Sequence, residues 1–462
     1  MKNKFLKMLT IFAALSAVTG CNGGNGQLSF SDDLSLDLSA DLEEEVTISF
    51  FGWGSLEERE NFQSLIEAFM EENPKIKVSY DATDSGQYMN SLKNKANRLP
   101  DVFYMPDYEF MQWADSGKLL PLDNFMSEEE LGSMWQMSTE MYRYDHDTYT
   151  LGEGRLFGLP KDLGPYTLVY NKTLLEEIMG ANVEYPSGSD PMSWAEFTTY
   201  LGKLKTRDVY PIGYYELMAA VYSNNANFFD DAVEKEMISD KNFIDAVQFI
   251  ADLTHNGLAP TANEQSEANS FQRFVTGNCV FTFMGPWDMA TFWKDVPFEY
   301  DIIPVPYGPA EGARSTAWVG SVAFCVSAQS KQKAAAVKLA KFLACSERAN
   351  KMNADLGQAV PNMIKYAEEY FVPGVGMTEA QKKAPTNRQL FLDIIEGATN
   401  PESNIGGKQR AKYFLYLNSC YDDLEASLST IYEGSKTAEQ HLKAYAATFQ
   451  KGLDDSNEEM GK

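Results

Sequence analysis

A tryptophan and an acid directly follow a turn in the stretch FTFMGPWDMATFW at 281–293. The turn is Gly285-Pro286, and Trp287 and Asp288 come next. A tryptophan at the end of a strand offers a flat apolar plane to a ligand, and a neighbouring carboxylate can accept hydrogen bonds. The alternative is that Trp287 fills the core. Because turns of this kind lie at the surface, we favour the exposed plane.

Other aromatic and polar side chains also follow apolar runs. Trp53 lies between Gly52 and Gly54, where glycines allow a ligand to come close, although it could equally pack on its own loop. Trp318 shortly precedes another glycine. The side chains that could hydrogen-bond to a ligand are Asp84, Gln87, Asp107, Tyr108, Glu109, Asn224 and Asn227. For the acids among them the alternative is a helix cap or a solvated turn.

Motifs for catalysis, metals and cofactors are absent from the sequence. The three histidines, His146, His255 and His441, are far apart, and there is no HExxH, GxSxG, GxxxxGK[ST] or GxGxxG after a strand. The 66 acidic residues could always supply a glycosidase pair, but no spacing singles one out. We therefore expect a protein that is not an enzyme and needs no cofactor, with an extracellular glycosidase as the enzymatic alternative.

The composition is that of a folded soluble protein, with 44% apolar and 23% charged residues. Lys and Arg total 39 against 66 acids, which gives a net charge of −27. Such a surface repels nucleic acids and anionic lipid headgroups, whereas a neutral ligand is compatible with it. At 462 residues the chain is long for one globular unit, so we expect two domains.

The first 45 residues predict export and anchoring. A basic start precedes an apolar run at 8–18 that is short for a membrane helix. The sequence Val-Thr-Gly-Cys that ends at Cys21 resembles a bacterial lipobox, so residues 1–20 are expected to be a lipoprotein signal peptide and Cys21 the lipidated residue. An ordinary signal peptide with a chance cysteine is the alternative. Residues 21–45, rich in Gly, Ser, Asn and Asp, predict a flexible tether outside the cytoplasm.

Four further cysteines, Cys279, Cys325, Cys345 and Cys420, are widely spaced in apolar surroundings, and no CxxC occurs. We expect buried thiols rather than a metal site or a disulfide framework, although an exported protein permits one or two bridges.

The order of the predicted elements indicates an α/β fold. Strands at 46–52, 75–82 and 101–105 alternate with helices at 56–72 and 85–98, which is the start of a doubly wound sheet. An extended segment at 156–171 then runs into another strand without a helix, as expected where a chain passes between two domains. The later elements are strands at 278–285, 299–306 and 323–328, helices at 240–255 and 331–344, a capping box at Ser193 and another at Thr437, and helices from about 363 to the end.

In order and spacing, several segments resemble the extracellular solute-binding proteins of ABC importers, the family that includes maltose-binding protein. They are VTISFFGWGS with NPKIKV, DVFYMPDYEFMQWADSGKLLPL, LFGLPKDLGPYTLVYNKTLLEE, SWAEF, FVTGNCVFTFMGPW and SKQKAAAVKLAKFLACSERANK. The resemblance implies a periplasmic-binding-protein-like fold of two lobes, each a doubly wound sheet flanked by helices, with the ligand in the cleft between them. One lobe would take residues 46–160 and 310–360, and the other 161–309 and 361–455.

The resemblance also implies roles for site residues. Trp287 would stack on a sugar ring, and Trp53, Trp318 and the polar side chains after the strands would line the cleft. Gly164 stands where maltose-binding protein has a carboxylate that contacts its ligand, which argues against maltose itself. Lys161 and Asp162 are the nearest substitutes.

We therefore expect a monomeric carbohydrate-binding component of an ABC importer, which would deliver an oligosaccharide to the permease subunits and be held to the membrane by the lipid on Cys21. Two other ligand classes stay open. A polyamine could use Asp84, Asp107 and Glu109. A glycerophosphodiester would need arginines, and only Arg388 comes into question.

Overall fold

The computed structural model describes residues 36–38, 43–357, 359–409 and 420–459. The expected signal peptide, Cys21 and nearly all of the expected tether lie outside these residues. Within them, no helix is both long enough and apolar enough to cross a membrane.

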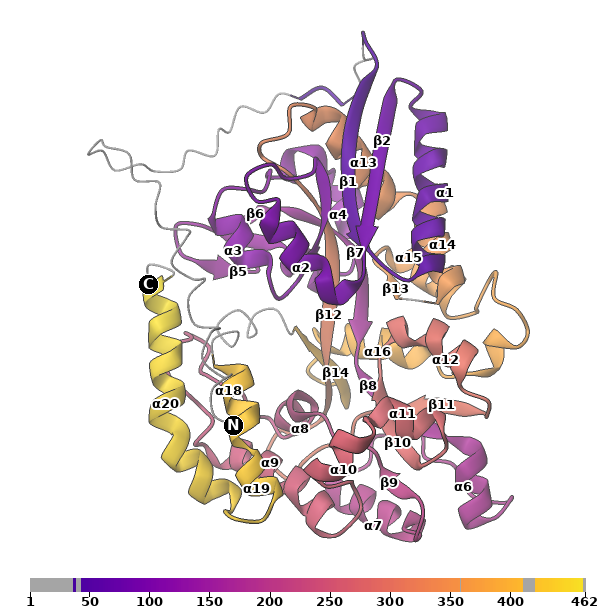
Figure 1. Ribbon diagram of the computed structural model, residues 1–462, viewed down its shortest axis with the longest axis vertical. Helices are drawn as coiled ribbons and strands as arrows, with labels where there is room; N and C mark the ends of the chain where they lie inside the picture. The colour runs from indigo at the N-terminus through magenta and orange to yellow at the C-terminus, as the bar shows by residue number, and fades with distance from the viewer. Residues whose placement is uncertain (1–35, 39–42, 358, 410–419, 460–462) are drawn as a thin grey trace, which may run out of the picture. The chain divides into compact units, whose positions relative to one another are not determined.

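A seven-stranded sheet combines four strands from the first part of the chain with three from beyond residue 314 (Figure 1). Its strand order is β13-β7-β12-β3-β1-β2, and β14 pairs with β12. The strands are β1 (Val46–Trp53), β2 (Ile76–Thr83), β3 (Val102–Pro106), β7 (Gly158–Pro165), β12 (Ser315–Val326), β13 (Val360–Pro361) and β14 (Ile405–Gln409). Because β1 runs parallel to both β2 and β3, the carboxyl ends of these three strands share one edge.

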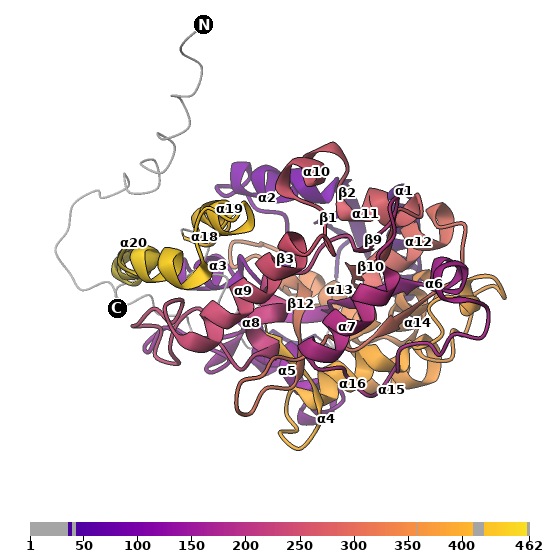
Figure 2. The same cartoon turned by 90° about the horizontal axis from the view of Figure 1, so that it is seen from below.

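A second, four-stranded sheet has the order β11-β8-β10-β9. Its strands are β8 (Thr167–Asn171), β9 (Tyr210–Ile212), β10 (Cys279–Met284) and β11 (Tyr300–Ile303). The short helix α8 (Leu217–Ser223) lies beside α9 (Lys241–His255) and contacts β12 of the first sheet (Figure 2).

The chain passes from the first sheet to the second at one residue. β7 ends at Pro165 and β8 begins at Thr167, so Tyr166 alone separates them. The Tyr166 N–H donates to the Trp318 carbonyl of β12 at 3.0 Å, which ties this passage to the second long strand. The chain thus changes sheets within the segment 156–171, and the assignment of the two sides to two domains stays a prediction.

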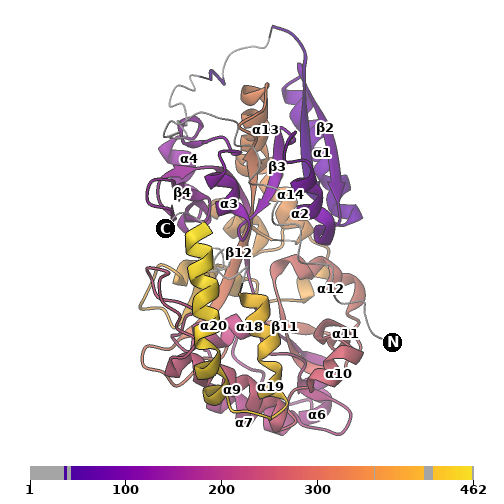
Figure 3. The same ribbon diagram turned by 60° about the vertical axis from the view of Figure 1, so that its left-hand side comes forward.

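Helices cover these sheets, and two predicted capping boxes are confirmed at their starts. The Ser193 hydroxyl and Glu196 cap α7 reciprocally, and Thr437 and Gln440 do the same before α20. Figure 3 shows α20 beside α18 and α19. The remaining helices are α1 (Leu56–Glu72), α2 (Ser85–Asn94), α3 (Phe110–Asp115), α4 (Glu128–Gly132), α5 (Gln136–Glu140), α6 (Lys172–Met179), α7 (Trp194–Leu204), α10 (Ala262–Glu267), α11 (Ser270–Val275), α12 (Met289–Asp295), α13 (Lys333–Cys345), α14 (Glu347–Leu356), α15 (Ile364–Tyr366), α16 (Gln389–Gly397), α18 (Tyr421–Ser427), α19 (Ser429–Tyr432) and α20 (Ala438–Glu459).

A third, three-stranded sheet and short helical turns complete the described elements. The sheet has the order β5-β4-β6. These elements are β4 (Arg143–Asp145), β5 (Thr150–Leu151), β6 (Arg155–Leu156), and the turns at Asp123–Phe125, Pro286–Asp288, Ala367–Phe371 and Gln381–Lys383.

Some predicted boundaries are wrong. The chain is not helical throughout from 363, because β14 adds a parallel strand to β12. The strand predicted at 323–328 is only the end of β12, which begins at Ser315 and is buried at nearly every residue. Since both faces of β12 are covered, apolar and polar residues do not alternate along it, and the sequence pattern does not show where the strand begins. The limits of the two lobes stay a prediction. The predicted second lobe includes 361–455, yet β14, which lies within that range, belongs to the seven-stranded sheet.

The four cysteines of the described residues form no disulfide with one another, and only Cys345 among them is partly exposed. Burial raises the pKa of Cys279 to about 12, so the thiol stays protonated. No group of three or more His, Cys, Asp or Glu residues in the described part could hold a metal ion.

Candidate functional site

Trp287 projects from a tight turn at the carboxyl end of β10. Gly285 is extended, and the turn Pro286–Asp288 follows. The Asp288 carboxylate Oδ2 accepts a hydrogen bond from the Gly285 N–H at 2.9 Å, which closes the turn. The Trp287 side chain is 39% exposed. The ring is therefore a surface group rather than core filler, and its role in binding stays a prediction.

Trp287 stacks on two other rings where the chain passes between the sheets. Its centroid lies 5.7 Å from Tyr166 at an interplanar angle of 11°, and 5.7 Å from Trp318 at 21°. Phe283 lies 5.5 Å from Tyr166, and Tyr214 lies 6.2 Å from Phe283. We call these five residues the aromatic wall: Tyr166, Tyr214, Phe283, Trp287 and Trp318. Phe283 and Trp318 are buried, Tyr166 and Tyr214 are partly exposed, and Trp287 is the exposed member. The buried rings thus support Trp287, whose exposed face can pack against the C–H face of a ring-shaped ligand.

Two glycines make room for the Trp287 ring. A Cβ atom at Gly164 would lie 2.4 Å from Cζ3 of the ring, and one at Gly285 would lie 2.3 Å from Cη2. Because neither contact is sterically possible, a side chain at either position would displace the ring. The position of the Trp287 ring thus requires glycine at 164.

Acidic groups flank the wall. Burial raises the pKa of Asp288 to about 6, and the Gly285 N–H only partly offsets this. Glu216 is buried and caps α8, because its carboxylate accepts hydrogen bonds from the Met218 and Ala219 N–H groups at 3.0 and 2.6 Å. Burial raises the pKa of Tyr166, and the charges of Asp288 and Glu216 raise it further. Both acids therefore act on the hydroxyl of Tyr166.

Trp53 ends β1 at the edge of the first sheet and is partly exposed. Two tyrosines of the same part of the chain, Tyr88 and Tyr104, contact its ring. Its centroid lies 4.6 Å from Tyr88 and 4.9 Å from Tyr104, both in edge-to-face geometry. The Tyr88 hydroxyl donates to the Tyr104 carbonyl at 2.7 Å, which fixes both supports. Trp53 is thus a rigid aromatic group at the end of β1.

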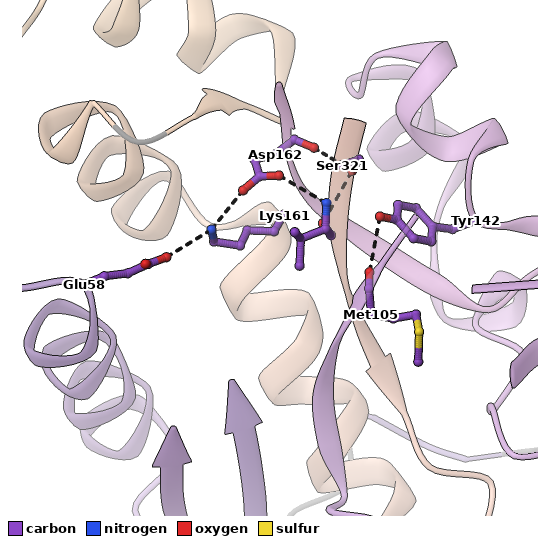
Figure 4. A network of polar contacts seen from close by, with 7 residues as sticks. Glu58, Met105, Tyr142, Lys161, Asp162 and Ser321 are labelled. Atoms are coloured by element: carbon purple, nitrogen blue, oxygen red, sulfur yellow. Dashed lines mark hydrogen bonds and ion pairs between the residues drawn. The ribbon is translucent and has the colours of Figure 1, made fainter. Parts of the chain in front are cut away.

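Lys161 belongs to a buried ionic network (Figure 4). Its Nζ lies 2.9 Å from Asp162 Oδ2 and 3.4 Å from Glu58 Oε1, and all three side chains are at most 10% exposed. Asp162 Oδ1 also accepts from the Val322 N–H at 3.2 Å, and its carbonyl accepts from the Ser321 hydroxyl at 2.6 Å. Burial alone would lower the pKa of Lys161, but the two carboxylates outweigh it and raise the pKa. Lys161 is therefore held by protein carboxylates.

The polar residues after β2 and β3 have different surroundings. Asp84 is 86% exposed on its side chain and pairs with Arg59 at 2.7 Å, without capping α2. Glu109 pairs with Lys93 at 2.9 Å. Asp107 is fully buried, whereas Tyr108 is partly exposed and Gln87 is exposed. The structure brings these residues to one edge of the first sheet but does not bring them all to the surface.

Of the two asparagine candidates, Asn224 is fully buried and its amide is used by the backbone. It donates to the Asn242 carbonyl at 2.7 Å and accepts from the Ala310 N–H at 3.1 Å. Asn227 accepts a hydrogen bond from the Lys408 ammonium. These bonds connect segments of the protein that are distant in sequence. Because the Asn224 amide is buried and bonded to the backbone, the structure does not support a ligand contact at Asn224.

The candidate site includes four residues that the sequence analysis missed: Tyr166, Tyr214, Phe283 and Glu216. Tyr166 could have been found, because it is the residue at the point where one strand run changes into the next in LGPYTLVYN. A surface hollow of about 560 Å³ beside α6 and α7 contains none of the predicted site residues.

Comparison with known proteins identifies the family. Residues 53–347 match the family model described as bacterial extracellular solute-binding protein. The chain belongs to this family. Its members are defined by binding rather than by catalysis.

Named relatives and solved structures are more distant. The chain is 22% identical to the maltotriose-binding protein of Pyrococcus abyssi over 53% of this chain and 50% of that protein, so it spans half the length of that relative. It is 22% identical to the galactooligosaccharide-binding protein of Bacillus subtilis over 86% of this chain and 87% of the relative. An ABC substrate-binding protein from Listeria monocytogenes in complex with cycloalternan has the same fold, with a TM-score of 0.71, 18% identity, and coverage of 90% and 100% of the two chains. The predicted two-lobe, periplasmic-binding-protein-like α/β fold is thereby confirmed.

Proposed function

We propose that this member of the family is the carbohydrate-binding component of an ABC importer and that it captures an oligosaccharide. The observation that carries the proposal is the aromatic wall, whose outermost ring, Trp287, is 39% exposed beside a carboxylate. Sugars have an apolar C–H face that packs on an aromatic plane, and hydroxyls that need fixed acceptors. The names of the relatives that bind maltotriose and galactooligosaccharides support the same class of ligand.

Each part of the proposed site has a task. Trp287 stacks on a sugar ring, and its seat on Gly164 and Gly285 keeps the ring in one orientation. Asp288 accepts hydrogen bonds from hydroxyls. Trp53 and the side chains at the edge of the first sheet meet the ligand from the other lobe. A ligand that contacts both lobes favours their closed arrangement, because only that arrangement satisfies both sets of contacts.

The proposal includes the place of the protein in the cell. We propose an extracytoplasmic monomer that is anchored by a lipid on Cys21, carries its binding domain on the tether 21–45 and delivers the sugar to the permease. The family name supports the extracellular location. The sequence Val-Thr-Gly-Cys is what supports the anchor.

The test is binding by the Trp287→Ala variant. A thermal-shift screen of neutral mono- and oligosaccharides first finds the ligand, because a ligand that binds only the folded state raises the melting temperature. Trp287→Ala should then weaken its affinity by about thirtyfold, which corresponds to about 2 kcal/mol. The matched control is Trp293→Ala, another partly exposed tryptophan, whose indole N–H donates to the Ala384 carbonyl at 2.6 Å.

The control should lose stability and keep its affinity. If Trp287→Ala bound the sugar as tightly as the wild type and unfolded earlier, the wall would be structural and the proposal wrong. Turnover of an oligosaccharide in place of stoichiometric binding would establish the glycosidase alternative.

A further inference from the structure

We infer that the site selects uncharged or amine-bearing saccharides and excludes anionic ones. The inference rests on the proposed function and adds the charge class of the ligand to it. It follows from two features of the charged side chains around the aromatic wall: carboxylates lie beside it, and the basic side chains already have partners.

Carboxylates stand at two places along the wall. Asp288 comes directly after the exposed ring of Trp287 and is fixed by the Gly285 N–H. Glu216 directly follows Tyr214 and Tyr215, and both tyrosines pack on Phe283, at 6.2 and 5.3 Å. Phe283 and Glu216 are buried, and Glu216 and Asp288 both act electrostatically on Tyr166 beside the exposed Trp287 ring. A ligand that stacks on Trp287 therefore meets Asp288 directly and lies in the field of a second carboxylate.

Two basic side chains on strands beside the wall, Lys161 on β7 and Lys408 on β14, are engaged with other groups. Lys161 is held between Glu58 and Asp162. Lys408, which pairs in register with Trp318, bonds to Asn227, and its ammonium lies 4.7 Å from the Tyr222 ring centroid. An anionic ligand would have to break one of these contacts to obtain a counter-ion.

The edge of the first sheet has the same balance of charges. Arg59 pairs with Asp84 at 2.7 Å, and Lys93 pairs with Glu109 at 2.9 Å. In each pair an acid already engages the base. The Asp84 side chain is 86% exposed, so it can accept from hydroxyl and ammonium donors as well. Among the described residues of this edge there is no arginine cluster of the kind that binds phosphate or carboxylate ligands.

The expected size of the discrimination follows from Coulomb's law. A unit charge about 6 Å from a carboxylate, at an effective dielectric constant near 20, changes an affinity by roughly a hundredfold. Screening at physiological ionic strength reduces this to roughly tenfold. We expect affinity to rise in the order uronate-bearing, neutral, amine-bearing, with at least about tenfold between the first and the last.

The experiment measures the binding of matched triplets of trisaccharides to the full-length protein. One triplet is built on maltotriose and one on β-1,4-galactotriose, each in a neutral form, a form with a terminal 2-amino group and a form with a terminal uronic acid. Calorimetry gives the dissociation constants at about 50 and about 500 mM salt, and the discrimination should shrink at the higher concentration.

Asp288→Asn removes one charge and keeps an oxygen that can accept from the Gly285 N–H. The readout is the ratio of the uronate to the neutral dissociation constant, which should fall at least threefold in this variant. Asp208→Asn is the matched control. Asp208 is exposed beside the start of β9, which runs parallel to β10, so it lies at the opposite end of the sheet from Asp288. The control should leave the ratio unchanged.

The outcomes separate this inference from the proposed function. If no neutral saccharide binds, the proposed function fails. If neutral and uronate forms bind equally, or the uronate binds more tightly, the inference is overturned while the carbohydrate function stands. An unchanged ratio in Asp288→Asn would overturn the assignment of the charge selection to the wall.

Discussion

Replacing Lys161 with methionine tests the buried ionic network most directly. Lys161 Nζ lies 2.9 Å from Asp162 and 3.4 Å from Glu58. At an effective dielectric constant near 20, each of these contacts is worth about 5–6 kcal/mol before desolvation is counted. Methionine has a similar length and no charge, so Lys161→Met leaves two buried carboxylates without a counter-ion and changes the packing little. We expect a loss of about 3–5 kcal/mol in the free energy of unfolding.

The pH dependence of this loss identifies its cause. In the wild type, burial raises the pKa of Glu58 and Lys161 only partly offsets it. Without Lys161, the repulsion between the carboxylates raises the pKa of at least one of them further. A carboxyl group with a raised folded-state pKa destabilises the fold when it is ionised and ceases to do so once it is protonated. The variant should therefore be much less stable than the wild type at about pH 8 and closer to it at about pH 5.

Urea denaturation, followed by tryptophan fluorescence, measures the effect. The double variant Glu58→Gln with Lys161→Met should recover part of the loss, because only one carboxylate then stays uncompensated. Lys443→Met is the control, since Lys443 pairs with Glu439 at the surface, with side chains 58% and 63% exposed, and should leave the midpoint unchanged. If Lys161→Met were as stable as the wild type at both pH values, the ionic network would contribute nothing to stability, and the buried position of Lys161 between the two carboxylates would be wrong.

Three further predictions concern the wall and the anchor. Gly164→Ala should displace the Trp287 ring, weaken sugar binding by roughly tenfold or more and cost about 1–3 kcal/mol of stability. The control Gly202→Ala, whose Cβ would meet nothing within 4 Å, should leave the affinity unchanged, and equal affinities of the two variants would show that Gly164 does not position the Trp287 ring. Asp288→Asn should gain stability over the wild type as the pH rises from about 4 to about 7, because the pKa of Asp288 is raised from 3.8 to about 6 and its ionisation opposes folding; parallel pH profiles would contradict this. Cys21→Ala should release the protein from membranes without changing sugar affinity, and mass spectrometry that finds no lipid on the wild-type N-terminus would contradict the anchor.

Much of the fold could be predicted because its signals are local. The helix at 56–72 has an apolar face at Phe62, Leu65 and Phe69, all at most 2% exposed, and Ser55 caps its start. β14 could not be predicted in this way. Its sequence IGGKQ has two glycines and no alternation, and it becomes a strand only because β12 offers it an edge. Tertiary pairing decides such segments, and no local pattern contains that information.

The candidate site shows the same division between local and non-local causes. The turn that presents Trp287 is visible in the letters GPW, since glycine and proline set its backbone. The seat of the ring is not visible there, because it depends on Gly164, more than a hundred residues earlier, and on Tyr166 and Trp318. In the sequence alone, Gly164 looked like the loss of a ligand-binding carboxylate. In the structure it is the position where any side chain would collide with Trp287. That contact joins residues far apart in the sequence, so the letters around Gly164 do not contain it.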